Sequence, residues 1–289
     1  KHAFKKEGHE LRAELKIATE EEMEKNYYIT HYRKPSINTF LDNNFLTTLS
    51  DEMQVTVDYT NPLTEDSKLE AGYDAFFNKY DIDFIGEYFD ETWNNFRVDP
   101  ERTNRFKYNE SVNAVYTTYQ KEFEKFGYEF GLRGEGVVTK SHLVTLDSFI
   151  TNRYFKLYPT VHLSYKLNDE QELQLNYSKR INRPDGDEMN PFPEYMDPRN
   201  LRAGNPKLLP EIIHSIEFGY RWQHRDFSFV PSIYFREKTD GFTSVVIALD
   251  DSTLLTTEQN LSKDQSEGLE LIFSYKRGKF YSGTLSTNL

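Results

Sequence analysis

Long runs of alternating apolar and polar residues recur along the whole chain. Residues 216–222, for example, read Ile-Glu-Phe-Gly-Tyr-Arg-Trp. A period of two places the apolar side chains on one face of an extended strand and the polar ones on the other. Many of the runs exceed the roughly 5–6 residues usual in globular proteins and suit the ~9–11 residues of a tilted membrane-spanning strand. We expect strands at residues 9–22, 45–60, 67–80, 104–121, 126–139, 154–168, 170–183, 211–225, 226–246, 257–276 and 279–289.

The connections between these strands alternate in length. Short ones are expected near 124–127, 168–170, 224–226 and 277–279, and long ones near 81–103, 140–153, 184–210 and 247–256. Short turns at one end and long loops at the other are typical of outer-membrane barrels, whose periplasmic turns are short. The sequence therefore predicts an all-β fold, in which long antiparallel meander strands form part, about half, of a transmembrane β-barrel.

The composition fits this architecture. The chain has 22 Phe and 20 Tyr among 289 residues, yet its mean hydropathy is −0.75. Only alternate residues of a barrel strand face lipid, so a polar average is compatible with a barrel, although it also suits a soluble β-protein with one solvated face. Aromatic residues near the short turns predict a girdle at one membrane interface: Tyr59, Tyr165, Tyr220, Trp222 and Tyr275.

Several functions are disfavoured. The 47 acidic and 35 basic residues give a net charge of −12, so nucleic acid is not an expected partner. The chain has no cysteine, and its seven histidines lack the spacing of metal-ligand pairs, so we expect neither a metal nor another cofactor. A Gly-x-Ser-x-Gly elbow is also missing, and we do not expect an enzyme. His162 and His214 are expected to face the lumen.

Residues 155–236 carry the most specific pattern. Its motifs stand in a fixed order: Arg-Pro at 183–184, Asn-Pro-Phe at 190–192, Gly-Asn-Pro-Lys-Leu at 204–208 and Pro-Glu at 210–211. This order resembles the barrel of TonB-dependent receptors, especially the outer-membrane β-barrel family of Bacteroidetes. Asp-Tyr-Thr-Asn-Pro-Leu at 58–63 and Gly-Leu-Arg-Gly-Glu at 131–135 extend the resemblance from about residue 50 to the end.

The resemblance implies nutrient uptake at the bacterial outer membrane. Such receptors bind a scarce nutrient outside the cell and import it with energy delivered by TonB, while a plug domain fills the lumen. The expected partners are outer-membrane lipid, an unidentified nutrient and the TonB system through a plug domain. No plug domain is recognisable in the chain, and about eleven strands cannot close a barrel of about 22. We therefore expect residues 1–289 to be one partial barrel domain without its plug and last strands.

Two stretches are candidates for ligand contact. Proline recurs through residues 184–210, which predicts an ordered loop because proline fixes φ; the plainer alternative is a cap on the barrel mouth. Residues 81–101 mix aromatic and acidic side chains that suit a sugar or a cation, or that pack on neighbouring loops. The candidate ligand-binding residues are Tyr88, Trp93, Phe96, Arg180, Arg183, Phe192 and Tyr195. The two arginines are expected to pair with Asp185, Asp187 or Glu211.

Other functions remain open at this point. A soluble β-sheet protein that binds a carbohydrate or another ligand predicts polar outer faces. A passive barrel or an adhesin shares the transmembrane fold but needs neither a plug nor TonB.

Overall fold

The computed structural model describes residues 1–289 apart from 32–38, 198 and 278–280. The chain forms one fifteen-stranded sheet in the order β1-β2-β3-β4-β6-β7-β8-β9-β12-β13-β14-β11-β10, with β5 beside β4 and β15 beside β14. The strands are β1 (His2–Ala3), β2 (Glu10–Thr30), β3 (Phe40–Pro62), β4 (Ser67–Asp90), β5 (Asn95–Val98), β6 (Asn104–Glu122), β7 (Phe126–Leu143), β8 (Ser148–Asn168), β9 (Gln171–Asn182), β10 (Glu194–Asp197), β11 (Asn200–Arg202), β12 (Glu211–His224), β13 (Phe227–Ala248), β14 (Leu254–Arg277) and β15 (Tyr281–Asn288).

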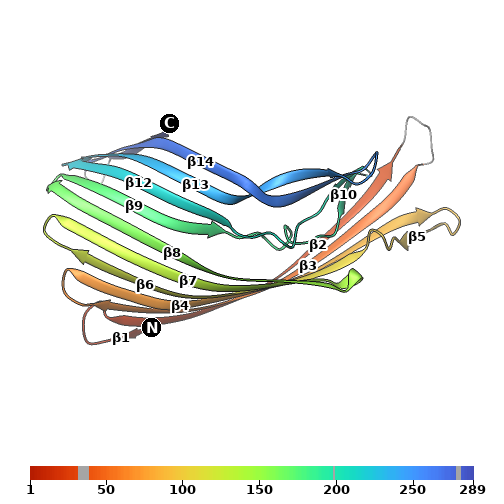
Figure 1. Ribbon diagram of the computed structural model, residues 1–289, viewed down its shortest axis with the longest axis horizontal. Coiled ribbons are helices and arrows are strands. Elements are labelled where there is room, and N and C mark those ends of the chain that lie inside the picture. The colour runs from red at the N-terminus through yellow and green to blue at the C-terminus, as the bar shows by residue number, and fades with distance from the viewer. Residues whose placement is uncertain (32–38, 198, 278–280) are drawn as a thin grey trace.

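The sheet curls into an open trough (Figure 1). Every pairing between the described strands is antiparallel except that between β11 and β14. Short turns lie at one end of the trough, and the other end holds the longer connections together with one tight connection at residues 144–147. A 3-10 helix, η1 (Val144–Leu146), interrupts the strands. Among the described residues no helix is long and apolar enough to cross a membrane.

The expected meander is confirmed. Four of the fifteen strands, β1, β5, β10 and β11, have two to four residues, and the remaining eleven overlap the eleven expected ranges. Two expected long loops are wrong. Residues 81–103 contain the second half of β4 and all of β5, and residues 140–153 contain only a tight connection around η1. In both places polar residues continue the strands because their backbones pair with a neighbouring strand.

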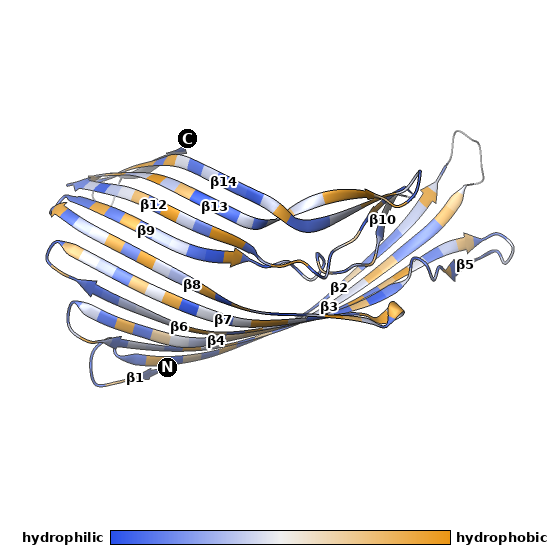
Figure 2. Cartoon of the chain, in the orientation of Figure 1, coloured by the Kyte–Doolittle hydropathy of each residue, from blue (hydrophilic) through white to orange (hydrophobic). Residues whose placement is uncertain are grey.

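Register separates the side chains onto two faces. Leu163, Leu175, Phe218, Ile233 and Leu269 form one row across β8, β9, β12, β13 and β14. Successive residues on a strand point to opposite faces. Register places this row on the face opposite to Phe106 and Tyr108, which are buried inside the trough, so the row lies on the convex face and the polar residues that alternate with it lie on the concave face. Figure 2 shows the same alternation of hydrophobic and hydrophilic residues along the strands.

The convex face is exposed and apolar over most strands. Leu175 is 41% exposed, Phe218 43% and Ile233 56%. A soluble protein rarely leaves so continuous an apolar surface open to water. The alternative of a soluble sheet with polar outer faces is therefore wrong.

The aromatic residues expected near the short turns share this face. Register places Tyr59, Tyr165, Tyr220 and Tyr275 on the same side as the apolar rows. Trp222 lies two residues beyond Tyr220 on the same side, close to the turn at Arg225, whose φ is 51°. The aromatic residues therefore lie at the short-turn edge of the apolar surface.

His214 departs from expectation. It lies two residues from Ile216 and so shares the convex face, where its Nδ1 is 3.0 Å from the hydroxyl of Tyr177. His162 lies on the concave face as expected and contacts Asn176 at 2.9 Å.

Candidate functional site

The concave face carries a cavity of about 580 Å³ on strands β3, β4, β6, β7, β8 and β9. Alternate positions of β7 turn Gly131, Arg133 and Glu135 toward it, on the face that they share by register with Tyr116 and Thr118 of β6. The other cavity residues are Gln54, Thr56, Asp74, Tyr116, Thr117, Thr118, Leu132, Tyr158, Thr160, Lys179, Arg180, Ile181 and Arg183.

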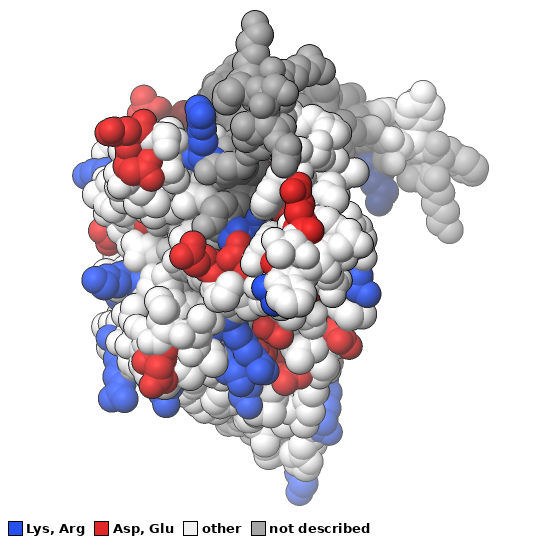
Figure 3. Space-filling view, turned by 90° about the vertical axis from the view of Figure 1, so that its right-hand side faces the viewer, with Lys and Arg blue, Asp and Glu red and all other residues white. Residues whose placement is uncertain are grey.

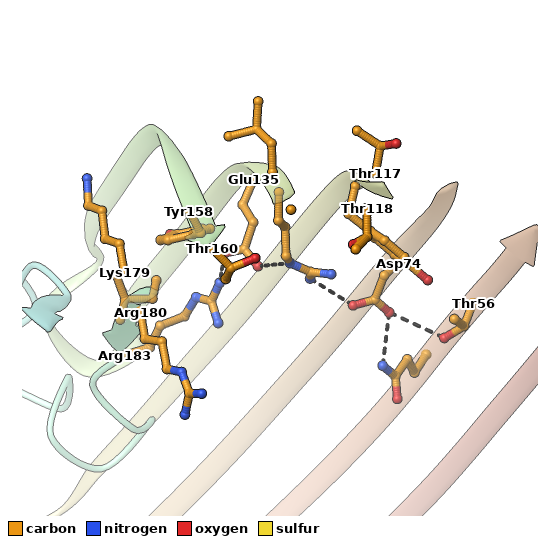
Figure 4. A pocket seen from close by; sticks show the side chains of 16 residues that line it. Thr56, Asp74, Thr117, Thr118, Glu135, Tyr158, Thr160, Lys179, Arg180 and Arg183 are labelled. Carbon is orange, nitrogen blue, oxygen red and sulfur yellow. Dashed lines mark hydrogen bonds and ion pairs between the residues drawn. The ribbon is translucent and has the colours of Figure 1, made fainter. Parts of the chain in front are cut away.

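A chain of charged side chains crosses this cavity (Figure 4). Arg133 donates from one terminal nitrogen to Asp74 at 2.9 Å and from Nε to Glu135 at 2.6 Å. Arg183 donates to the other oxygen of Glu135, and its Nε lies 3.8 Å from Glu110. Because opposite charges alternate, each carboxylate is held beside a guanidinium group. We call Asp74, Arg133, Glu135, Arg183 and Glu110 the lumen network.

Neutral groups complete the network at both ends. Gln54 donates to Asp74 at 2.9 Å, and Tyr116 donates to Asp58 while its ring lies 5.7 Å from the Arg133 guanidinium carbon. Gly72 makes room for the Tyr116 ring, since a Cβ there would lie 2.3 Å from it. Tyr158 is 7% exposed, and within the described part of the chain its hydroxyl makes no hydrogen bond of good geometry. The cavity therefore offers both charged groups and a buried hydroxyl.

The loop of residues 183–210 folds into the trough, and we call it the inward loop. Met189 and Leu208 from this loop are 1% and 2% exposed, and they pack with Phe106 and Tyr108 of β6 and Ile82 of β4. Leu143 belongs to the same cluster, and Phe192 packs against it. This contact explains why two aromatic residues on the concave face of β6 are buried in an otherwise wet trough.

Backbone contacts hold the inward loop in one conformation. Gly204 donates to the carbonyl of Asn190 at 2.7 Å, and Asn205 donates to that of Glu188 at 2.6 Å. A Cβ on Gly204 would lie 2.4 Å from the Glu188 carbonyl oxygen, so only glycine fits there. Beyond this crossing, β11 pairs with β14 and the side chain of Asn260 binds both main-chain groups of Leu209.

Glu211 anchors the end of the inward loop. This buried carboxylate accepts hydrogen bonds from Asn182 at 3.0 Å and from the backbone of Phe242 at 2.7 Å, and Lys238 lies 3.2 Å away. Burial alone would raise the pKa of Glu211, but these hydrogen bonds outweigh it and lower the pKa. A register shift of β13 between Lys238 and Phe242 frees the Phe242 amide for this contact.

Two acids inside the inward loop behave in the opposite way. Burial raises the pKa of Asp187, and the nearby Asp185 adds to this effect. Burial also raises the pKa of Glu188, whose carboxylate accepts a hydrogen bond from the Asp185 amide at 2.8 Å. These carboxylates are therefore less readily ionised than acids in water.

A second candidate surface is the hairpin of β4 and β5 at the long-loop end. Trp93 is 68% exposed at its tip and stacks with Arg97 at 5.4 Å, next to Asn94 with φ 49°. Phe96 packs edge-on against Phe89 at 5.3 Å. Acidic and basic side chains are interspersed over this end of the molecule (Figure 3).

The sequence candidates fall in three places. Arg180 and Arg183 line the cavity, Phe192 belongs to the inward loop and packs against the buried cluster of Met189 and Leu208, and the remaining described candidates, Tyr88, Trp93 and Phe96, lie on the hairpin of β4 and β5. The side chain of Tyr195 lies outside the described residues. The expected ion pairs of Arg183 with loop acids and with Glu211 are wrong, because Arg183 pairs with Glu135 and Glu110 on the barrel wall.

Sequence reasoning missed most of the cavity. Asp74, Arg133, Glu135, Tyr116 and Tyr158 were not among the candidates. A signal was present, since Arg133 and Glu135 are charged residues at alternate positions of a strand whose other face is apolar. Among the described residues, no group of three or more His, Cys, Asp or Glu side chains is arranged to hold a metal ion. The arrangement favours binding of a polar ligand or protein surface.

The chain belongs to the outer membrane protein beta-barrel family, whose model matches residues 2–289. It is accordingly a protein of the bacterial outer membrane. No curated protein sequence matches it significantly. The solved structures that it resembles are TonB-dependent receptor barrels, which confirms the expected fold.

Three of these structures show how much of a receptor the chain represents. The copper transporter OprC superposes with a TM-score of 0.64 at 15% identity, over 98% of this chain and 44% of that one. The RagAB peptide transporter gives 0.59 at 14%, over 98% and 34%. The ferric-catecholate import receptor Fiu from E. coli K12 gives 0.57 at 12%, over 98% and 46%. The chain thus spans less than half the length of each.

Proposed function

We propose that residues 1–289 form part of the barrel wall of a TonB-dependent receptor that imports a nutrient across the outer membrane. The observation that carries this proposal is the pairing of an exposed apolar convex face with a charged concave face into which the inward loop folds. An apolar outside suits lipid, and a charged inside suits a plugged lumen. Further strands would close the barrel, and a plug domain would connect it to TonB.

In this proposal the ligand meets the receptor at the long-loop end. The exposed Trp93 and the half-buried Phe96 on the hairpin offer aromatic surfaces for first contact, and the inward loop narrows the path below them. Arg180 and Arg183 would then meet a polar or anionic ligand, or the plug, in the cavity. The similar structures are described as transporters of copper, of peptide and of ferric catecholate, so they leave the ligand class open.

The test is uptake by the complete gene product in its own host, with and without TonB. Deletion of the gene should abolish growth on one limiting source from a panel of ferric siderophore, copper, peptide, glycan and vitamin. Loss of TonB should have the same effect. Uptake that persists without TonB would instead support a passive barrel, and normal growth of the deletion strain on every source would support an adhesin.

A further inference from the structure

A group of cations occupies outward positions halfway along β4 and toward the long-loop ends of β6, β7 and β8: Lys79, Arg105, Lys107, Lys140 and Arg153. We call it the outer basic patch. Its orientation follows from its neighbours on β6. Phe106 and Tyr108 are 0% and 2% exposed under the inward loop, so Arg105 and Lys107 point to the convex face.

Register brings the patch together across strands. Lys79 pairs with Asn109, which pairs with Lys140, so these two lysines share a row. Lys107 and Arg153 occupy the rows on either side of Lys140. Neighbouring strands lie about 4.8 Å apart. The long side chains of Lys79, Lys140 and Arg153 can therefore all reach toward one ligand group a few ångströms wide.

Acids neutralise only part of the patch. Arg105 and Lys107 contact Asp81 at 2.7 and 3.3 Å, and Asp83 lies one outward position further along β4. Lys79, Lys140 and Arg153 are exposed and form no ion pair within the described part of the chain. On the adjoining strand β3 the register partner of Lys79 is Asp51, an acid. The row of cations therefore ends at β4.

The patch borders the apolar surface. Phe155, two residues from Arg153 on the same face of β8, is 65% exposed. The next outward row toward the short turns holds Val57, Tyr73, Val115 and Leu157. The long-loop end of a barrel faces the outside of the cell, so the patch lies where acyl chains of the outer leaflet give way to headgroups.

We propose that the outer basic patch binds the phosphate of a phosphorylated glycolipid in the outer leaflet. Lysine and arginine bind phosphate by charge and hydrogen bonding, and basic clusters beside a membrane attract anionic headgroups. A lipid is favoured over a free anion because its acyl chains also cover the apolar rows below, whereas none of the patch residues lines the cavity. The inference rests on the proposed contact of the convex face with lipid.

The test uses the complete gene product, purified from outer membranes in mild detergent and exchanged into three probes: diphosphorylated lipid A, the same lipid A without phosphate, and inorganic phosphate. Native mass spectrometry counts the bound molecules. The triple variant Lys79→Gln, Lys140→Gln, Arg153→Gln removes three cations that have no ion pair to lose. The matched control, Lys121→Gln, Lys125→Gln, Lys166→Gln, removes three at the short-turn end.

We expect the wild type and the control to retain diphosphorylated lipid A, and the triple variant to retain it about tenfold less or weaker still, since each cation near the headgroup contributes a few-fold. Equal retention by the triple variant, equal retention of lipid A without phosphate, or binding of inorganic phosphate alone would each overturn the proposal. Heat-shifted gel mobility confirms that the variants fold. The lipid contact itself is tested separately at positions 215–218, so failure of the patch is distinguishable from failure of the barrel assignment.

Discussion

At the scale of single residues, the concave face depends on carboxylates that have been taken out of water. The Glu135 side chain is 7% exposed and Asp74 16%, and Arg133 lies between them. A buried charge that loses its partner keeps its desolvation cost. The same pairing on the surface contributes little because water screens it.

Replacement of Arg133 by Gln should therefore destabilise the folded barrel by about 1–3 kcal/mol, because Asp74 and Glu135 lose their shared donor. The midpoint of heat-induced mobility shift on gels measures this loss. Replacement of Arg12, whose contact with Glu14 is exposed, serves as the control and should change stability by about 1 kcal/mol or less. Equal effects of the two changes would contradict the role of the lumen network.

Glu211 makes the anchoring of the inward loop depend on pH. Its pKa is below the ordinary value of 4.5, so its contribution is complete above that value and is lost as the pH falls through the lower folded pKa. We expect the inward loop to become sensitive to an acid protease only below about pH 4.5. In the Glu211→Gln variant the loop should be cleaved at neutral pH as well, and identical pH profiles for both proteins would count against this anchor.

At the scale of elements, the strands were predictable where one face is apolar. Val161 to Leu167 alternates because one side faces away from the wet trough, and the expected strand matches β8 there. The part of β4 beyond residue 80 was missed because its outward residues Asp81 and Asp83 are acidic, and its apolar residue Ile82 lies on the concave face under the inward loop. It is held by pairing with β3, which no local pattern reveals.

The candidate site was less predictable for a related reason. Arg133 and Asp74 are 59 positions apart, and only register brings them together. The prolines of the inward loop predicted an ordered segment. Packing and backbone hydrogen bonds hold that segment in place. Its direction into the trough depends on Met189 and Leu208 meeting Phe106, a contact between segments about 80–100 residues apart.

The close backbone contact of Gly204 with Glu188 and Asn190 can be tested for its role in holding the inward loop. Gly204→Ala places a methyl group 2.4 Å from the Glu188 carbonyl, so we expect the loop to leave the trough and become cleavable by proteases between residues 183 and 210. Gly283→Ala is the matched control, because a Cβ there meets nothing within 4 Å. Limited proteolysis followed by mass spectrometry reads the outcome. A loop that stays protected in Gly204→Ala would show that this contact does not hold it.

At the scale of the whole molecule, the chain forms one wall with two chemically opposite faces. The convex rows would contact lipid, and the concave network would contact water, a ligand or a plug. The soluble and the membrane architectures differ in this one property, since both permit long antiparallel strands. The assignment of residues 1–289 as one partial barrel domain also depends on this difference between the two faces.

The most direct test of this wall uses the absence of cysteine from the chain. Single cysteines at Ser215, Ile216, Glu217 and Phe218 sample both faces of β12 within one strand. In the complete gene product in outer membranes, we predict that a membrane-impermeant maleimide labels positions 215 and 217, and that 216 and 218 stay unlabelled until the lipid is removed by detergent. Equal labelling at all four positions, or labelling of 216 and 218 in intact membranes, would contradict the account.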